Sequence, residues 1–118
     1  MSPELVAVVD DDPRIRELLA AELEDLGAEV LRCSDGRQLL HHPRLAEVQL
    51  VLLDWMMPGL DGAGTLRQLQ AQGYPGRVVV ITALCDPAVQ AQALEADATA
   101  TLLKTEALGA LPQLLNQG

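Results

Sequence analysis

The chain has 118 residues, of which 49% are hydrophobic, and a formal net charge of −9 from 17 acidic and 8 basic side chains. This hydrophobic content is enough for the core of one domain, so disorder along the whole length is excluded. The negative charge repels phosphate backbones and anionic membrane surfaces, and Trp55 and Tyr74 are the only aromatic residues, so we expect no direct binding to nucleic acid or to a membrane.

No hydrophobic run approaches the roughly 20 residues that a membrane-spanning helix needs. Residues Met1–Glu4 contain no basic region and no long hydrophobic stretch, so no secretory signal is expected. Cys33 and Cys85 lack the spacing of a metal site and are expected to be free thiols in a reducing compartment. We therefore expect a cytoplasmic single domain over residues 1–118, and the sequence leaves open whether this is a whole protein.

The first half of the chain alternates short hydrophobic runs with helical patterns. Residues 5–9 form a continuous β-branched run, which predicts a strand buried on both faces. A helix is predicted over 13–26, with Asp12 as its N-cap, Pro13 at its first position and Gly27 at its end. A weaker strand at 28–32, a short helix at 35–41 and a second buried strand at 49–53 follow.

The second half repeats this alternation. A helix is predicted from Asp61–Gly62 to Gly73, a buried strand at 77–81, a helix opening at Asp86–Pro87, a weak strand at 98–103 and a last helix at 105–116. Gly109 and Pro112 lie inside the last helix. Because proline removes a backbone donor and clashes with the preceding turn, this helix is expected to be interrupted, and so kinked or short.

Strand and helix therefore alternate through the chain. This order predicts the α/β class: a doubly wound (βα)5 domain with a five-stranded parallel sheet and helices on both faces. In such sheets, ligands bind beyond the carboxyl ends of the strands. Polar residues end four of the predicted strands, namely Asp10, Asp11 and Asp12 after the first, Asp54 after the third, Thr82 after the fourth and Lys104 after the fifth.

The carboxylates of Asp10, Asp11 and Asp54 are expected to lie close together. Two like charges about 4 Å apart repel by about 4 kcal/mol at an effective dielectric of about 20, so such a cluster needs a cation. Oxygen ligands on adjacent strand ends suit Mg²⁺, and a divalent ion together with Lys104 would neutralise the three acids. Taken singly, these residues could also be a charged loop and a surface lysine, and Thr82 a helix-capping hydroxyl.

Two stretches resemble a known family. The run from Val8 to Pro13 is similar to the opening of a response-regulator receiver domain, and the run from Leu53 to Gly62 resembles the segment around its phosphorylated aspartate. Thr82-Ala83 and Lys104 stand at the family's spacing, and the resemblance covers essentially the whole chain. It implies a flavodoxin-like sheet of order 2-1-3-4-5 and a phosphoacceptor domain of a two-component or phosphorelay system.

The resemblance also implies a role for each site residue. Asp54 would accept a phosphoryl group from the phosphohistidine of a sensor histidine kinase or a histidine phosphotransfer protein. Asp11 and Asp54 would bind Mg²⁺ (or Mn²⁺) directly, Asp10 would hold it through water, and the backbone carbonyl of Met56 would be a further ligand. Such a domain assists its own phosphorylation and dephosphorylation, and we expect no turnover of an external substrate.

The chemistry of phosphoryl transfer agrees with these roles, because it consists mostly of positioning and charge neutralisation. A carboxylate is expected to be ionised at neutral pH, so Asp54 would need no general base. Mg²⁺ and Lys104 would offset the charge on the phosphoryl oxygens, and Thr82 would donate a hydrogen bond to one of them.

Three positions depart from the family pattern. Thr101 replaces an aromatic residue that usually changes rotamer with the phosphorylation state, which leaves open how a signal passes. Thr105 replaces a proline that follows the lysine in a cis bond. Without proline a cis bond costs about 3–4 kcal/mol, so we expect a trans bond, which leaves the reach of Lys104 open. Asp97 replaces a glycine, and aspartate tolerates the left-handed conformation.

Three other functions share some of these sequence features. A haloacid-dehalogenase-like phosphatase also uses Asp, Thr, Lys and Mg²⁺, but it needs an acidic pair after the lysine, where Glu106 is the only acid. A flavodoxin-like binding module needs a loop rich in glycine and hydroxyl groups after the first strand, where this chain has three aspartates. A pseudo-receiver, acting only as an interaction surface, stays open because of Thr101 and Thr105.

Overall fold

The computed structural model describes residues 3–57, 59–84 and 86–115, so Cys85 and the expected helix end at residue 116 lie outside it. The elements are β1 (Leu5–Val9), α1 (Pro13–Asp25), β2 (Glu29–Cys33), α2 (Gly36–Leu40), the short 3-10 helix η1 (Leu45–Glu47), β3 (Leu50–Asp54), α3 (Gly62–Ala71), β4 (Arg77–Thr82), α4 (Pro87–Glu95), β5 (Ala100–Leu103) and α5 (Lys104–Leu115). The strands pair in parallel in the order β2-β1-β3-β4-β5. The predicted fold class and strand order are confirmed.

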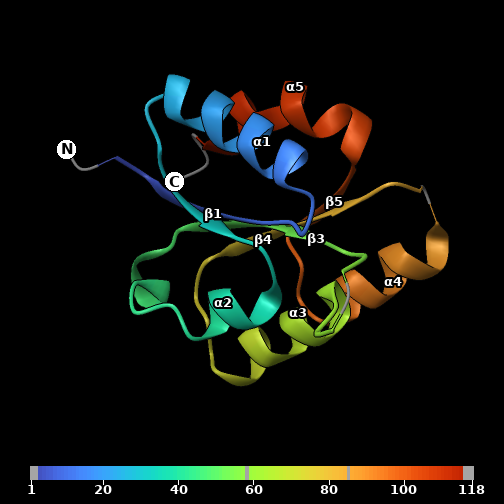
Figure 1. Ribbon diagram of the computed structural model, residues 1–118. Helices are drawn as coiled ribbons and strands as arrows, with labels where there is room; N and C mark the ends of the chain where they lie inside the picture. Colours follow the sequence, from blue (N-terminus) through green and yellow to red (C-terminus); the bar gives the residue numbers. More distant parts are fainter. Residues whose placement is uncertain (1–2, 58, 85, 116–118) are drawn as a thin grey trace.

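The sheet lies between two layers of helices, with α1 and α5 on one face and α2, α3 and α4 on the other (Figure 1). Alternate residues of each strand point to opposite faces, so the β-branched runs supply two cores at once. The core under α1 and α5 includes Val6, Val8, Leu19, Leu23, Leu50, Leu52, Ile81 and Leu111. The core on the other face includes Ala7, Val9, Leu39, Val51, Leu53, Leu66, Leu69, Val80 and Ala93.

Aspartates begin four of the helices. The N-cap carboxylates of α1, α2, α3 and α4 each accept a hydrogen bond from a backbone N–H in the first turn, and they belong to Asp12, Asp35, Asp61 and Asp86. Such a cap stabilises a helix by about 1 kcal/mol compared with alanine. These aspartates have a structural task, so Asp12 is set apart from Asp10 and Asp11 although the three are consecutive.

One expectation about the end of the chain is confirmed and one is wrong. Lys104 directly follows β5, as expected, and it is the first residue of α5, where the carboxylate of Glu106 accepts a hydrogen bond of 2.8 Å from the N–H of Leu103. The expected interruption of the last helix is wrong, because α5 continues through Pro112 to Leu115. Leu111 and Leu115 are buried on either side of the proline, and their packing offsets the backbone hydrogen bond that proline cannot make.

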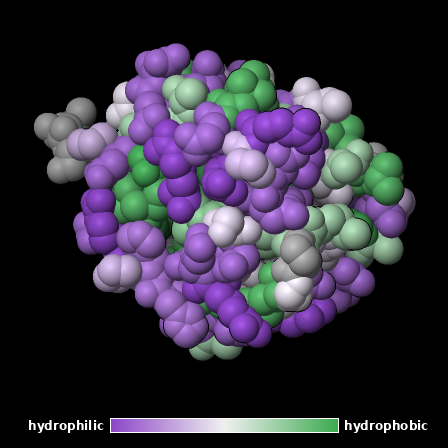
Figure 2. Space-filling model, in the orientation of Figure 1, coloured by the Kyte–Doolittle hydropathy of each residue, from purple (hydrophilic) through white to green (hydrophobic). Residues whose placement is uncertain are grey.

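The surface facing the viewer is mostly hydrophilic (Figure 2). Large hydrophobic side chains are exposed at Leu18, Leu26, Met56, Leu84, Leu94 and Leu108. In the described part of the chain, none of the helices has the length and hydrophobicity to span a membrane.

Candidate functional site

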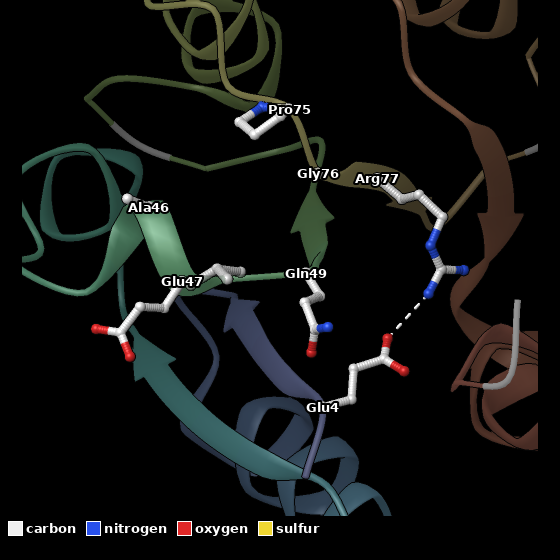
Figure 3. Close-up of a pocket in the computed structure, with 8 residues that line it drawn as sticks. Glu4, Ala46, Glu47, Gln49, Pro75, Gly76 and Arg77 are labelled. Atoms are coloured by element: carbon white, nitrogen blue, oxygen red, sulfur yellow. Dashed lines mark hydrogen bonds and ion pairs between the residues drawn. The ribbon is translucent and has the colours of Figure 1, made fainter. Parts of the chain in front are cut away.

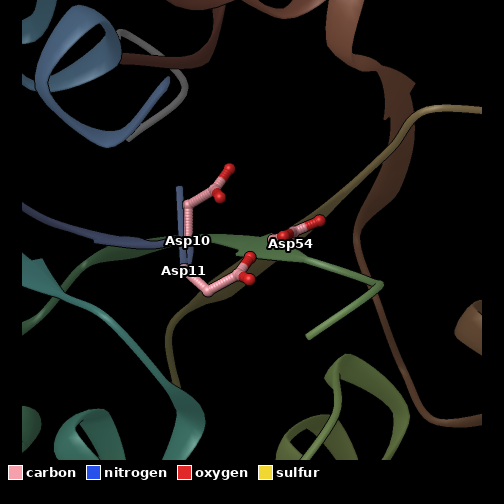
Figure 4. Close-up of side chains that lie close together, drawn as sticks. All are labelled: Asp10, Asp11 and Asp54. Atoms are coloured by element: carbon pink, nitrogen blue, oxygen red, sulfur yellow. The ribbon is translucent and has the colours of Figure 1, made fainter. Parts of the chain in front are cut away.

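Three aspartates meet at the carboxyl edge of the sheet. Asp10 and Asp11 follow β1, Asp54 ends β3, and these strands are neighbours paired through Val9 and Leu53. One carboxylate oxygen from each aspartate lies within 4.8 Å of the others (Figure 4). Asp10 and Asp54 are buried, and Asp11 is exposed. The parallel sheet therefore brings together the three acids that the sequence placed at strand ends.

Asp10 is held by several hydrogen bonds. Its N–H donates to the carbonyl of Cys33 at 3.1 Å, which ties it to the end of β2. Its Oδ1 accepts a bond of 2.9 Å from the N–H of Asp12, and its backbone carbonyl accepts one of 2.8 Å from the guanidinium of Arg16. Sequence reasoning missed Arg16, because a helical arginine that folds back to a strand end follows no periodic pattern.

Lys104 reaches the cluster from the start of α5. Its Nζ lies 3.5 Å from Oδ1 of Asp54 and 3.8 Å from Oδ2 of Asp10. The described residues contain no cis peptide bond, so the bond to Thr105 is trans, as expected. The replacement of the family proline therefore does not keep the ammonium group away from the acids.

The environment of Asp54 raises its pKa. Burial, followed by the nearby charge of Asp10, raises the pKa of Asp54 to about 7, although Lys104 and the N–H of Met56 act in the opposite direction. In the chain without a cation, the carboxylate expected to be ionised at neutral pH is therefore only partly ionised. The sequence could not show this, because burial follows from how the strand ends are covered.

The oxygen atoms around Asp54 fit a hard divalent cation. Among the described residues, Oδ2 of Asp54 is buried without a hydrogen-bond partner, and a buried acceptor of this kind is costly unless a ligand satisfies it. No donor from the described residues bonds the backbone carbonyl of Met56, whose N–H donates to Oδ1 of Asp54 at 3.3 Å. Together with the exposed carboxylate of Asp11, these oxygens could hold a cation such as Mg²⁺.

Thr82 lies at the same edge but is not bonded to the acids. It ends β4 and is buried, and its Oγ1 forms hydrogen bonds of 3.3 Å with both the N–H and the carbonyl of Leu84. Ile81, the residue before it, is the β4 partner of Asp54. The hydroxyl of Thr82 therefore lies one residue beyond the strand partner of Asp54, while it bonds its own loop.

The segment after Asp54 depends on Gly62, the first residue of α3. Its N–H donates to the carbonyl of Trp55 at 3.1 Å. A Cβ at this position would lie 2.6 Å from the Cα of Trp55 and 2.7 Å from the carbonyl oxygen of Asp54. Only glycine lets α3 approach the site this closely. The resemblance of the run from Leu53 to Gly62 did not by itself explain why this position is a glycine.

The structure also describes Asp97 and Thr101, the other two positions that depart from the family pattern. Asp97 has a φ of 66°, which confirms the expected left-handed conformation, and its carboxylate accepts a hydrogen bond of 2.9 Å from Gln70. Thr101 is half-buried in β5 beside Val80 of β4.

A separate hollow of about 400 Å³ lies at the opposite edge of the sheet, where the strands begin (Figure 3). Its polar side chains already have partners. Glu4 and Arg77 form an ion pair of 2.9 Å, and the side-chain carbonyl of Gln49 accepts a hydrogen bond of 3.0 Å from the N–H of Leu5. The acidic cluster, and not this hollow, gathers the groups suited to chemistry.

Comparisons with known proteins agree with this geometry. The family model for the response regulator receiver domain matches residues 6–116. The chain is 33% identical over 104 residues to "Probable transcriptional regulator ycf27" of Porphyridium aerugineum, which is 88% of this chain and 43% of that protein. It is 37% identical over 100 residues to the DNA-binding response regulator MtrA of Mycolicibacterium smegmatis, with 84% and 43% covered. The chain thus spans less than half the length of these relatives.

A solved structure shows the same architecture. The receiver domain of the Francisella response regulator 1452 superposes with a TM-score of 0.87 at 26% sequence identity, over 96% of this chain and 93% of that one.

Proposed function

Because the chain belongs to the response regulator receiver family of two-component signalling, we propose that Asp54 is its phosphoacceptor and that residues 1–118 form one receiver domain. One observation supports this proposal most directly. Oδ2 of Asp54 is buried and has no hydrogen-bond partner among the described residues, and the other oxygen of the same carboxylate lies 3.5 Å from Nζ of Lys104. Family membership also sets aside the dehalogenase-like phosphatase and the flavodoxin-like binding module.

In the proposed reaction, a carboxylate oxygen of Asp54 attacks the phosphorus of a phosphohistidine. The new P–O bond forms as the P–N bond breaks, and the departing imidazole takes a proton from water. The product is an acyl phosphate on Asp54. The donor would be a sensor histidine kinase or a histidine phosphotransfer protein.

The cation site has a defined set of protein oxygens. Asp11 and Asp54 would bind the ion directly, the carbonyl of Met56 would be a third ligand, and Asp10 would hold it through water. When bound, Mg²⁺ (or Mn²⁺) supplies positive charge that offsets the phosphoryl oxygens and favours the ionised form of Asp54. This requirement is stronger here than in an exposed site, because burial raises the pKa of Asp54 to about 7.

Lys104 and Thr82 would contact the phosphoryl group. The ammonium of Lys104 already lies beside Asp54 and would pair with one phosphoryl oxygen. The hydroxyl of Thr82 would leave the backbone of Leu84, to which it is bonded at 3.3 Å, and donate to another oxygen. The hydroxyl would give up two hydrogen bonds of 3.3 Å between neutral groups, and one charge-assisted bond, about twice as strong as a neutral one, would offset their loss.

The partners and the location are part of the same proposal. The named relatives are a transcriptional regulator and a DNA-binding response regulator, but a net charge of −9 makes contact with nucleic acid through this domain unfavourable. We propose that the domain acts in the cytoplasm as a signalling switch, without membrane contact and without turnover of an external substrate.

The test is labelling by acetyl phosphate with Mg²⁺, followed by intact mass. A phosphorylated side chain adds about 80 Da, and we expect this on the native protein and not on Asp54→Asn. Asp61→Asn is the matched control, because asparagine also caps a helix well, and it should be labelled like the native chain. If the native protein binds Mg²⁺ but is never labelled, the domain is a pseudo-receiver and the proposal is wrong.

A further inference from the structure

Arg16 links the start of α1 to the end of β1. Its guanidinium NH1 donates a hydrogen bond of 2.8 Å to the backbone carbonyl of Asp10. We propose that Arg16 is a positioning residue of the cation site, which holds the Asp10–Asp11 segment so that both carboxylates face Asp54. This inference rests on the proposed function, because it assigns Arg16 a part in binding the ion that phosphorylation needs.

The bonding of Arg16 differs from that of most other arginines in the chain. Ion pairs with carboxylates are made by Arg14, Arg32, Arg44 and Arg77. In the described part of the chain, Arg16 makes no such pair, and its one side-chain hydrogen bond goes to the Asp10 carbonyl. Arg37 and Arg67 also lack ion pairs there, but they are exposed, whereas Arg16 is half-buried. The chain has 17 acidic residues with which Arg16 could pair. Its guanidinium is instead held by the backbone carbonyl of Asp10.

The contact holds the peptide group between Asp10, which would hold the ion through water, and Asp11, which would bind it directly. The carbonyl of Asp10 belongs to the peptide group that joins it to Asp11, so the bond from Arg16 restrains the backbone from which the Asp11 side chain extends. Asp11 is exposed, and packing therefore does not fix its carboxylate. With the N–H of Asp10 bonded to Cys33 and its Oδ1 bonded to Asp12, the bond from Arg16 completes the restraint on this turn.

The charge of Arg16 and its positioning role have opposite effects on cation binding. A guanidinium near the acids repels a divalent ion, so its charge alone predicts that removing Arg16 strengthens Mg²⁺ binding. Loss of the restraint on Asp10 and Asp11 predicts weaker binding, because the ligands must then be ordered when the ion binds. The sign of the change in Mg²⁺ affinity therefore separates the two effects.

The experiment measures the Mg²⁺ dissociation constant at pH 8 from the fluorescence of Trp55, the chain's single tryptophan and the neighbour of Asp54. We expect Arg16→Ala to weaken binding about tenfold, the lower end of the range for residues that orient metal ligands. Arg16→Lys should recover most of the affinity, since its ammonium can donate to the same carbonyl. Arg14→Ala removes the same charge from an exposed neighbour and should leave the affinity near the native value.

A second measurement needs no cation. The N–H of Asp12 donates to Oδ1 of Asp10, so its hydrogen exchange in EDTA reports how well this turn is held. Exchange should be faster in Arg16→Ala than in the native chain and in Arg14→Ala. Alanine is the best helix former, so α1 is expected to stay folded. Arg16→Met, which keeps the aliphatic stem, provides the same comparison should the alanine variant unfold.

The outcomes separate the two proposals. If Arg16→Ala binds Mg²⁺ as tightly as the native chain or more tightly, or if Arg16→Lys restores nothing, the positioning role is wrong. If the native chain itself binds no Mg²⁺, it is the proposed function that fails.

Discussion

The ammonium of Lys104 lies 3.5 Å from a carboxylate oxygen of Asp54, although the peptide bond after Lys104 is trans. The start of α5 holds the lysine in place, with the carboxylate of Glu106 bonded to the N–H of Leu103. Because the same ammonium lies 3.8 Å from Asp10, the positive charge of Lys104 offsets the negative charge of two buried acids. The start of α5 therefore brings the lysine to the acids without a cis peptide bond after it.

Substitution of Lys104 should slow phosphorylation without abolishing it. Lys104→Met removes a charged hydrogen-bond donor worth about 1.5–3 kcal/mol, which corresponds to a rate of labelling by acetyl phosphate about 10- to 150-fold lower. Stopped-flow fluorescence of Trp55 measures this rate. Arg67→Met, an exposed position outside the site, is the control and should react at the native rate. An unchanged rate in Lys104→Met would show that the ammonium takes no part.

The raised pKa of Asp54 should appear as a dependence of stability on pH. The pKa of this group is about 7 in the folded chain against a reference of 3.8, so the folded state holds the proton more tightly. The stability contributed by the protonated acid is fully present below about pH 4 and is lost as the pH rises through about 7.

In EDTA at pH 8, Asp54→Asn should therefore be more stable than the native chain by about 1–3 kcal/mol, and by less at pH 5. Urea denaturation at the two pH values measures the difference. A difference that does not change with pH would mean that the buried charge of Asp54 is not what destabilises the native chain.

Gly62 should tolerate no side chain. In Gly62→Ala the new Cβ would meet the backbone of Trp55 at 2.6 Å, so α3 or the segment after Asp54 must shift. We expect a loss of about 1–3 kcal/mol in the free energy of unfolding, the usual range for overpacking. Gly109→Ala is the matched control, because a Cβ there meets nothing within 4 Å and alanine favours the helix. Equal stability of the two variants would contradict the close approach of α3.

Thr101 should limit how far a phosphorylation signal spreads. It is a half-buried threonine in β5, and it lacks the ring whose change of rotamer the resemblance to receiver domains led us to expect at this position. On addition of beryllofluoride and Mg²⁺, we expect NMR shift changes around Asp54, Thr82 and Lys104, without propagation to α4. Large changes along α4 would show that the signal takes another route.

The order of the elements could be predicted because buried strands and amphipathic helices leave different patterns. The convergence of Asp10, Asp11 and Asp54 followed from the rule that parallel strands end at one edge. The passage of α5 through Pro112 could not be predicted, since it depends on the burial of Leu111 and Leu115 against the sheet.

Features of the site that depend on tertiary contacts could not be predicted from the sequence either. The pKa of Asp54 depends on burial and on the distances to Asp10 and Lys104. The bond from Arg16 to the Asp10 carbonyl depends on the angle at which α1 leaves β1. Neither the pKa of Asp54 nor the angle between β1 and α1 can be read from the order or spacing of residues.

The most direct test of the central claim is to locate the phosphoryl group after reaction with acetyl phosphate. Tandem mass spectrometry of rapidly digested protein should find an adduct of about 80 Da on Asp54 when Mg²⁺ is present, and none after EDTA treatment. An adduct on another residue, or no adduct at millimolar Mg²⁺, would contradict the assignment of Asp54 as the phosphoacceptor.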